Sequence, residues 1–232
     1  MRVIVTRPLK SARRTAIKLA ALGHEALLLP LTQAEHWTDV GLAALARPHR
    51  AIVFTSAEAI RALAGIDLAR HAETPVFTVG EASGEAAHKA GFRRVTAGSG
   101  TGEDLAKRIV GTGLDPLLYL AGTPRSPGFE DELQRQGVRC HVAECYAMVP
   151  RPWTTAEIAL LEPTPDGLLL YSREAARLFF THPAVRARRQ GLAGLRVYCL
   201  SRAIADAIPD DFTVERVISP APSEAELLAL LS

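Results

Sequence analysis

The fold of this chain is decided by AIVFTSAEAI, residues 51–60, in which a short apolar strand runs directly into a helix start. A similar stretch, LLLYSREAA, occupies residues 168–176 and shows the same order of apolar strand, serine and helix-forming residues. Short apolar runs that alternate with helical segments are typical of βαβ units around a parallel sheet. The sequence therefore predicts an α/β protein.

The same alternation continues along the whole chain. It predicts strands at residues 2–7, 24–30, 51–56, 75–79, 93–97, 117–122, 140–146, 166–172, 196–201 and 214–219. Several of the helices between them end at a glycine, namely Gly23, Gly91 and Gly137, and glycine adopts the left-handed conformation of a helix cap at little cost. Ten strands are too many for one domain of this length, so we expect two five-stranded sheets.

A weak internal repeat indicates how the strands divide between the two sheets. Residues 3–30 resemble residues 118–146, residues 54–59 resemble residues 170–175, and residues 79–82 resemble residues 200–203. We therefore expect one discontinuous α/β domain made of residues 1–32 plus 151–232. A second α/β domain would span residues 38–146, permuted relative to the first, so that the chain crosses between the domains twice.

Composition excludes several classes of protein. The chain is 48% apolar and 22% charged, which is ordinary for a globular protein, and its net charge of +2 is too small to suggest a nucleic-acid partner. No apolar run approaches the roughly 20 residues that span a bilayer. The apolar run near the start, VIV (residues 3–5), is too short for a signal peptide. We expect a cytoplasmic protein with no membrane partner.

The sequence contains no recognisable motif for binding a metal or a dinucleotide. The three cysteines form no C-x-x-C pair and lie in strand-like segments, which predicts buried free thiols, and the seven histidines show no ligand spacing. The run GSGTG, residues 98–102, lacks the spacing of a dinucleotide-binding loop and reads as a helix start. The expectation is therefore a protein without metal or cofactor.

Small residues follow the expected strand ends, where ligands bind in parallel sheets. The positions are Ser56, Gly80, Gly122, Ser172 and Ser201. Free N–H groups and the positive end of the helix dipole attract anions there, although helix capping alone requires the same residue types.

Arginines add to this pattern. Arg7, Arg173 and Arg202 directly follow strand ends of the first expected domain, and Arg125 follows one of the second. The planar guanidinium suits carboxylates and phosphates, although each arginine could equally be a solvated surface residue. Taken together, the strand ends predict an anionic ligand.

The motifs at these strand ends resemble the uroporphyrinogen-III synthase family over essentially the whole chain. The matching pieces are VTRP (5–8), VFTSAEA (53–59), VGEAS (79–83), LYLAG (118–122) with Arg125, Leu133 and Gly137, CY (145–146), YS (171–172) and CLS (199–201). Each piece is weak alone, and their order and spacing together are specific.

The resemblance implies two flavodoxin-like domains joined by a two-stranded linker, with the ligand cleft between them. We also expect a monomer. The resemblance further implies a cofactor-free lyase of tetrapyrrole (haem, sirohaem or cobalamin) biosynthesis. The substrate would be hydroxymethylbilane, a linear tetrapyrrole with eight carboxylates. It loses water, its ring D is inverted through a spiro intermediate, and it closes as uroporphyrinogen III.

The resemblance also assigns roles to residues. Tyr146 corresponds to the tyrosine considered as general acid, although a tyrosine packed for structure in the linker is an equal reading. The implied substrate-binding residues are Arg7, Ser56, Gly80, Ser83, Gly122, Arg125, Ser172, Arg173, Ser201 and Arg202. The chain departs from the family at Ala203 and Ile204, where threonines are common, whereas Ser83 keeps the hydroxyl of the threonine it replaces.

Two other functions remain open on the sequence. One is a non-catalytic two-lobed module that binds a tetrapyrrole or another metabolite, and the other is a flavin or nicotinamide oxidoreductase. A visible spectrum of the purified protein distinguishes the second, and an assay with hydroxymethylbilane distinguishes the first.

Overall fold

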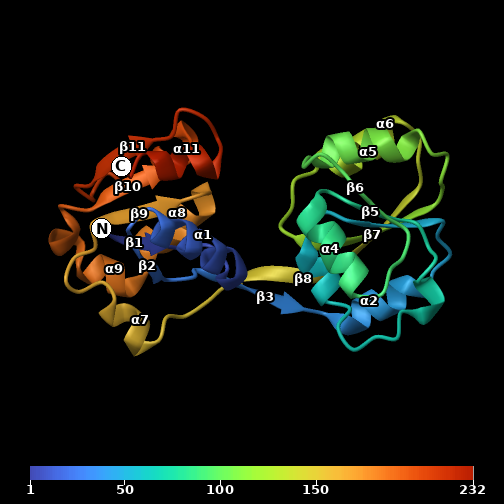
Figure 1. The fold of residues 1–232 in the computed structure, drawn as a ribbon, viewed down its shortest axis with the longest axis horizontal. Coiled ribbons are helices and arrows are strands. Elements are labelled where there is room, and N and C mark those ends of the chain that lie inside the picture. Colours follow the sequence, from blue (N-terminus) through green and yellow to red (C-terminus); the bar gives the residue numbers. More distant parts are fainter. Residues whose placement is uncertain (232) are drawn as a thin grey trace. The chain divides into compact units, whose positions relative to one another are not determined.

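The computed structural model describes residues 1–231, which divide into two compact units. Unit 1 consists of residues 1–33 and 150–231, and unit 2 of Ala34–Val149. Each unit is an α/β structure in which helices flank a sheet made entirely or mostly of parallel strands (Figure 1). Ser232, the last residue of the first expected domain, lies outside the described residues.

Unit 1 contains a five-stranded sheet in the order β11-β10-β9-β1-β2, and all its strand pairs are parallel. The strands are β1 (Arg2–Val5), β2 (Glu25–Leu28), β9 (Gly167–Leu170), β10 (Arg196–Cys199) and β11 (Glu215–Ile218). The helices are α1 (Leu9–Ala21), α7 (Thr155–Ala159), α8 (Arg173–Thr181), α9 (Pro183–Ala187), α10 (Arg202–Ala205) and α11 (Glu224–Ala229), with a 3-10 turn, η2, at Arg189–Leu192.

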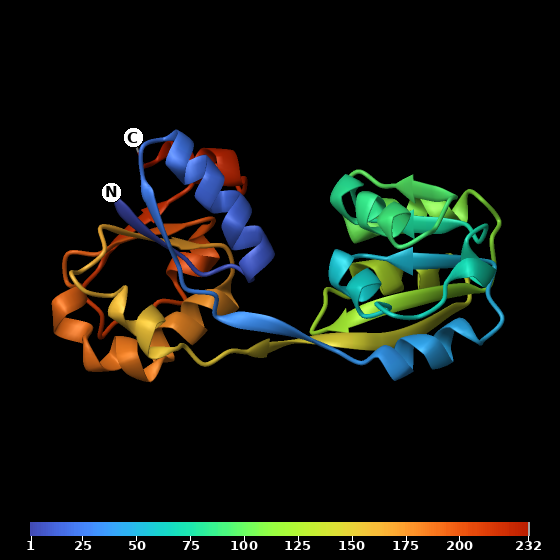
Figure 2. The same cartoon turned by 60° about the horizontal axis from the view of Figure 1, so that its bottom comes forward.

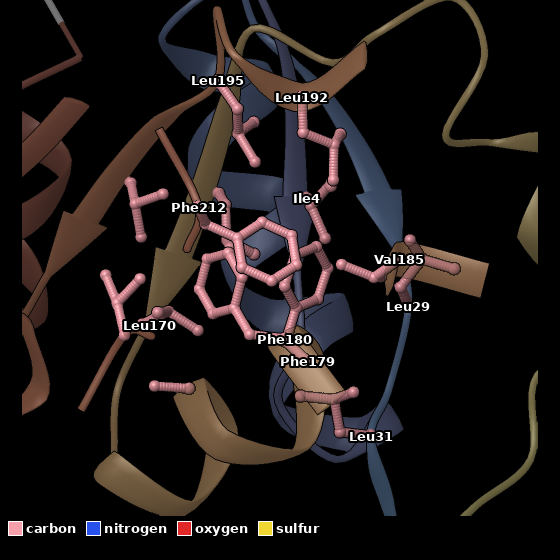
Figure 3. Packing of buried hydrophobic residues seen from close by; sticks show 14 of the residues in the cluster. Ile4, Leu29, Leu31, Leu170, Phe179, Phe180, Val185, Leu192, Leu195 and Phe212 are labelled. Atoms are coloured by element: carbon pink, nitrogen blue, oxygen red, sulfur yellow. The ribbon is translucent and has the colours of Figure 1, made fainter. Parts of the chain in front are cut away.

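Both faces of this sheet are covered, which explains why its strands are continuously apolar rather than alternating. Val3 and Val5 of β1 point towards α1 and α11, and all atoms of both residues are buried. Ile4 points to the other face, where Phe179 and Phe180 of α8 form the core of the cluster in Figure 3. A three-layer sandwich results, with the sheet in the middle.

Unit 2 contains a six-stranded sheet in the order β3-β8-β7-β4-β5-β6. The strands are β3 (Thr32–His36), β4 (Ala51–Phe54), β5 (Val76–Thr78), β6 (Val95–Ala97), β7 (Leu117–Thr123) and β8 (Cys140–Pro150). The helices are α2 (Thr38–Leu45), α3 (Ala57–Arg61), α4 (Glu81–Lys89), α5 (Gly102–Val110) and α6 (Gly128–Arg135), with a 3-10 turn, η1, at Ala69–His71. Buried residues of α2, α3 and α4 cover one face, and those of α5 and α6 cover the other.

The strand orders agree with the internal repeat. Reading β9, β10 and β11 as equivalents of β4, β5 and β6, and β1 and β2 as equivalents of β7 and β8, gives the same order in both sheets. The equivalents follow one another in a different order along the chain. The permutation that the repeat predicts is therefore present in the connectivity of the sheets.

All ten predicted strands are present among residues 1–231, but the expectation of two five-stranded sheets is wrong. The additional strand is β3, TQAEH, whose residues are polar and mostly exposed. A strand of this kind carries no periodic apolar signal, so the sequence does not reveal it. The helix caps at Gly23, Gly91 and Gly137 are confirmed, because all three glycines have positive φ.

Strands β3 and β8 are neighbours, and each runs across the boundary between the two units (Figure 2). The backbone N–H of Trp37 donates to the carbonyl of Cys145 at 2.8 Å, and the N–H of Arg151 donates to the carbonyl of Leu31 at 2.9 Å. As the residue number rises on one strand it falls on the other, which is the register of an antiparallel pair.

Cys145 and Cys199 are buried free thiols, as predicted, whereas Cys140 is only partly buried because it lies at the first position of β8. Burial raises the pKa of the Cys145 and Cys199 thiols to about 11. No helix within residues 1–231 combines the length and the apolar character that a bilayer crossing requires. In the same part of the chain, no three His, Cys, Asp or Glu side chains come together in a group that could hold a metal ion.

Candidate functional site

In unit 2, the structure brings Tyr146 directly against Gly122. The two residues are partners in the register of β7 and β8, at a point where the register shifts by a β-bulge. A Cβ atom at Gly122 would lie 2.1 Å from Cζ of Tyr146 and 2.5 Å from its hydroxyl oxygen. No residue but glycine leaves room for the phenol ring at this position.

The side chain of Ser56 lies close enough to the phenol of Tyr146 to lower its pKa. Tyr146 is 8% exposed, and burial raises the pKa of its phenol above the usual value, while Ser56 acts in the opposite direction. Tyr146 is therefore protonated at neutral pH, and Ser56 is placed to stabilise the phenolate that would form if the proton were donated.

Ser56 is positioned by the start of α3. It is the N-cap residue, with extended backbone, and its Oγ accepts a hydrogen bond from the N–H of Glu58 at 3.1 Å. Serine at this position stabilises the helix start, so capping and the contact with Tyr146 are performed by one side chain.

Gly80 and Ser83 lie at the start of α4, at the carboxyl end of β5. Gly80 is the N-cap residue, and Ser83 is buried in the first helical turn. A Cβ at Gly80 would meet nothing within 4 Å, and the backbone there is extended. The space beside Gly80 is therefore open.

Arg125 lies beside a pocket of about 600 Å³ at the same edge of unit 2. Its guanidinium donates to Glu130 at 2.6 Å and to Glu144 at 2.6 Å. The hydrogen bond with Glu130, followed by that with Glu144, raises the pKa of Arg125 above its usual value. The pocket is also lined by Tyr119 and by the first residues of α5 and α6. An arriving carboxylate would therefore meet an arginine that already has two acidic partners.

In unit 1, Arg173 and Arg202 are exposed at the starts of α8 and α10. Neither guanidinium forms an ion pair within residues 1–231. Ser172 caps α8 and accepts a hydrogen bond from the N–H of Ala175 at 3.1 Å, whereas Ser201 caps α10 without a side-chain hydrogen bond. The carboxyl edge of this sheet thus offers two uncompensated guanidinium groups beside two helix starts.

Arg7 is held differently. Its guanidinium stacks on the ring of Tyr171, 4.3 Å from the centroid, and donates to Glu224 at 2.7 Å. Glu224 also accepts from Tyr171 at 3.1 Å, from Thr15 at 2.7 Å, and from Lys18. Burial on its own would raise the pKa of Glu224, but Lys18, Thr15 and Arg7 lower it to about 2. This cluster ties α11 to β1 and α1.

Replacing Glu224 with glutamine is expected to destabilise unit 1 at neutral pH. The folded-state pKa is about 2, below the ordinary value of 4.5, so the stabilisation is fully present above pH 4.5 and is lost as the pH falls towards 2. Denaturant unfolding of wild type and Glu224→Gln should therefore differ at pH 7 and converge between pH 4.5 and 2. A difference that stays constant over this range would show that the charge of Glu224 does not stabilise the fold.

The departure at residues 203 and 204 has a structural explanation for one position. Ile204 is 5% exposed and belongs to the core cluster beneath α10, so its side chain packs against the sheet. Ala203 is exposed and carries no hydroxyl. Ser201 and Arg202 are therefore the residues at this helix start that can reach a ligand with polar groups.

Sequence reasoning missed His36, Glu58 and Glu224. Glu58 lies within the motif VFTSAEA, where an acidic residue in the first helical turn is common for helix stability alone, and Glu224 directly follows the N-cap Ser223 in the same way. His36 lies on β3, the strand that the sequence did not reveal. Only contacts between distant parts of the chain identify these residues.

Comparisons with known proteins point to one family. The family model described as uroporphyrinogen-III synthase HemD matches residues 13–229. The chain is similar to the solved uroporphyrinogen-III synthetase from Helicobacter pylori, with 15% identity over 99% of this chain and 97% of that chain, at a TM-score of 0.63. It is also similar to a mutant uroporphyrinogen III synthase from Thermus thermophilus, with 20% identity, coverage of 100% and 97%, and a TM-score of 0.54.

A comparison with curated proteins finds no match. At these identities, the two solved structures show the fold, a mixed α/β fold with parallel sheets. The family match is what bears on activity, and it confirms the resemblance drawn from the strand-end motifs.

Proposed function

We propose a site and a mechanism on the premise that the chain belongs to the uroporphyrinogen-III synthase family. It is accordingly a cyclising lyase, which converts hydroxymethylbilane, with inversion of ring D and loss of water, to uroporphyrinogen III in tetrapyrrole biosynthesis. Membership in this family of enzymes disfavours the alternative of a non-catalytic binding module. What remains to be proposed is which residues perform the reaction.

The chemistry makes two demands on the protein. Hydroxymethylbilane also cyclises unaided, to the isomer in which ring D is not inverted, so the enzyme must hold the chain in one folded shape. Such an orientation effect can supply roughly 7–11 kcal/mol of a barrier when the reacting atoms are well placed. The departing hydroxyl also requires a proton, which a general acid can provide.

We propose that Tyr146 is that acid. Its phenol donates a proton to the departing hydroxyl as the C–O bond breaks, water leaves, and the pyrrole nitrogen supplies the electron pair. The substrate releases a proton when the pyrrole becomes aromatic again, and the phenolate recovers it. The observation that carries this proposal is the placement of Tyr146 against Gly122 and Ser56, with a pKa that keeps the phenol protonated.

Binding of the eight carboxylates is proposed to fall on the strand ends of both units. In unit 1, Arg173 and Arg202 are supported by the helix starts at Ser172 and Ser201, where free N–H groups favour anions. In unit 2, we propose that substrate carboxylates bind at the helix start formed by Gly80 and Ser83 and in the pocket beside Arg125.

We propose that Arg7 and Arg125 contribute less to carboxylate binding. Because each already donates to acidic residues, a substrate carboxylate would share the guanidinium with them rather than neutralise a free charge. We therefore assign the larger share of carboxylate binding to Arg173 and Arg202.

The two units are proposed to be flavodoxin-like domains, residues 1–32 plus 151–232 and residues 38–146, joined by a linker of β3 and β8 and sharing one substrate. The all-parallel five-stranded sheet of unit 1 and the crossing of β3 and β8 at the boundary between the units support this reading. The proposal includes a monomer that works in the cytoplasm without a nucleic-acid partner, in keeping with the small net charge.

Replacing Arg173 or Arg202 with alanine is expected to raise KM for hydroxymethylbilane by about three- to tenfold and to leave kcat within about twofold. A hydrogen bond to a charged group is worth roughly 1.5–3 kcal/mol, and solvent screening reduces this at exposed residues. The changes Ser172→Ala and Ser201→Ala should have smaller effects. The assay is isomer III formation measured by chromatography.

Arg177→Ala is the matched control for this experiment. It lies on α8, one turn after Arg173, and its guanidinium is already paired with Glu174. The KM of the Arg177→Ala variant for hydroxymethylbilane should equal that of wild type. If the double variant of Arg173 and Arg202 also kept the wild-type KM, unit 1 would not bind the substrate carboxylates through these residues.

A further inference from the structure

Tyr146 has a direct neighbour on each side in the sheet, because β8 lies between β7 and β3. On the β7 side, the neighbour is Gly122. On the β3 side, the antiparallel register given by the hydrogen bonds between β3 and β8 places His36 opposite Tyr146. Side chains opposite one another in such a pair are in contact.

The contact between His36 and Tyr146 is aromatic. The ring centroids are 6.4 Å apart and the planes are inclined at 61°, which is an edge-to-face arrangement. Gly122 contributes only backbone on the other side. The imidazole of His36 is therefore the side chain that limits movement of the phenol towards β3.

His36 is itself fixed by Glu58. Nε2 of His36 lies 3.1 Å from Oε2 of Glu58, and Nε of Arg61 donates to the same oxygen at 2.8 Å. Burial alone would raise the pKa of Glu58, but the hydrogen bonds and charges of Arg61 and His36 outweigh it and hold the pKa below the usual value. The carboxylate is thus charged, and it anchors the imidazole.

Glu58 also connects to the other contact of Tyr146. Its backbone N–H donates to Ser56, the side chain that lowers the pKa of the Tyr146 phenol. Glu58, at the start of α3, therefore contacts both His36, which packs against the ring of Tyr146, and Ser56, which lies beside its hydroxyl.

We propose that His36, anchored by Glu58, is a positioning residue that fixes the phenol of Tyr146 for proton donation. The inference rests on the role proposed above for Tyr146. The contact of His36 with Tyr146 is between the rings, and no hydrogen bond joins the two side chains within residues 1–231, so His36 acts through Tyr146. A displacement of about 1 Å at a reacting group can cost roughly 10²-fold in rate, which sets the scale of the expected effect.

The test is a double-mutant cycle of His36→Ala and Tyr146→Phe, with kcat and KM measured for isomer III formation. His36→Ala should lower kcat on the order of 10- to 100-fold and leave KM within about twofold. In the Tyr146→Phe background, His36→Ala should cause no further loss, because the hydroxyl that it positions is absent.

Two further variants keep the result interpretable. Glu35→Ala changes the preceding residue of β3, whose side chain points to the opposite face, and should leave kcat unchanged. His36→Phe keeps an aromatic ring against Tyr146, should retain more activity than His36→Ala, and serves in the cycle if the alanine variant does not fold.

The possible outcomes separate the two proposals. A silent Tyr146→Phe would remove the role of Tyr146 and the inference about His36 together. A slow Tyr146→Phe with a wild-type His36→Ala would overturn the inference about His36 alone. A rise in KM at unchanged kcat, or losses that multiply in the double variant, would likewise overturn it, since His36 would then act independently of Tyr146.

Discussion

Tyr146→Phe is expected to lower the turnover of hydroxymethylbilane by about 10²–10⁴-fold, the usual contribution of a general acid. Phenylalanine keeps the ring against Gly122 and His36 and removes only the hydroxyl beside Ser56. KM should change little, because the carboxylate contacts remain. The melting temperature should stay close to that of wild type, since the variant keeps the packing of the ring.

The matched control is Tyr198→Phe, which removes a hydroxyl from a buried tyrosine of β10 in unit 1 and should leave turnover unchanged. Measurements of isomer III formation and melting temperature for both variants decide the question. Full activity in Tyr146→Phe, together with loss of stability in Tyr146→Ala, would make this tyrosine a structural residue of β8.

Gly122→Ala is expected to lower both activity and stability. The new methyl group would lie 2.1 Å from Cζ of Tyr146, so the ring must move and its hydroxyl must leave the observed position beside Ser56. Overpacking of this kind typically costs about 1–3 kcal/mol of the free energy of unfolding. Turnover should fall into the range of Tyr146→Phe, because the hydroxyl is present but displaced.

Gly194→Ala is the control for this change, since a Cβ there meets nothing within 4 Å and the backbone does not require glycine. Denaturant unfolding and turnover should both match wild type in the control. A folded Gly122→Ala protein with wild-type turnover would mean that the observed position of the Tyr146 ring is not the one used in catalysis.

The regular part of the fold was predictable because it depends on local patterns. Parallel strands buried on both faces read as apolar runs, as in residues 3–5 and 168–170, and Gly23, Gly91 and Gly137 mark helix ends. Strand β3 was not predictable, because its stability comes from pairing with β8 and not from its own polar sequence.

The candidate site was predictable only as a list of positions. The sequence selects strand ends and places hydroxyl, glycine and arginine residues there, but it does not show which of them meet. Ser56 and Tyr146 are far apart in the chain, and the bulge that aligns Gly122 with Tyr146 has no sequence signature. The acidic partners of Arg7 and Arg125 likewise come from contacts between different elements, so the sequence did not indicate that these two arginines are paired.

The most direct test of the account is the isomer composition of the product when the purified protein is incubated with freshly prepared hydroxymethylbilane. Chromatography after oxidation separates isomers I and III, and a reaction without protein gives the uncatalysed rate and composition. The account predicts rapid consumption of the bilane, with isomer III as the main product. Formation of isomer I alone, at the rate of the reaction without protein, would contradict it.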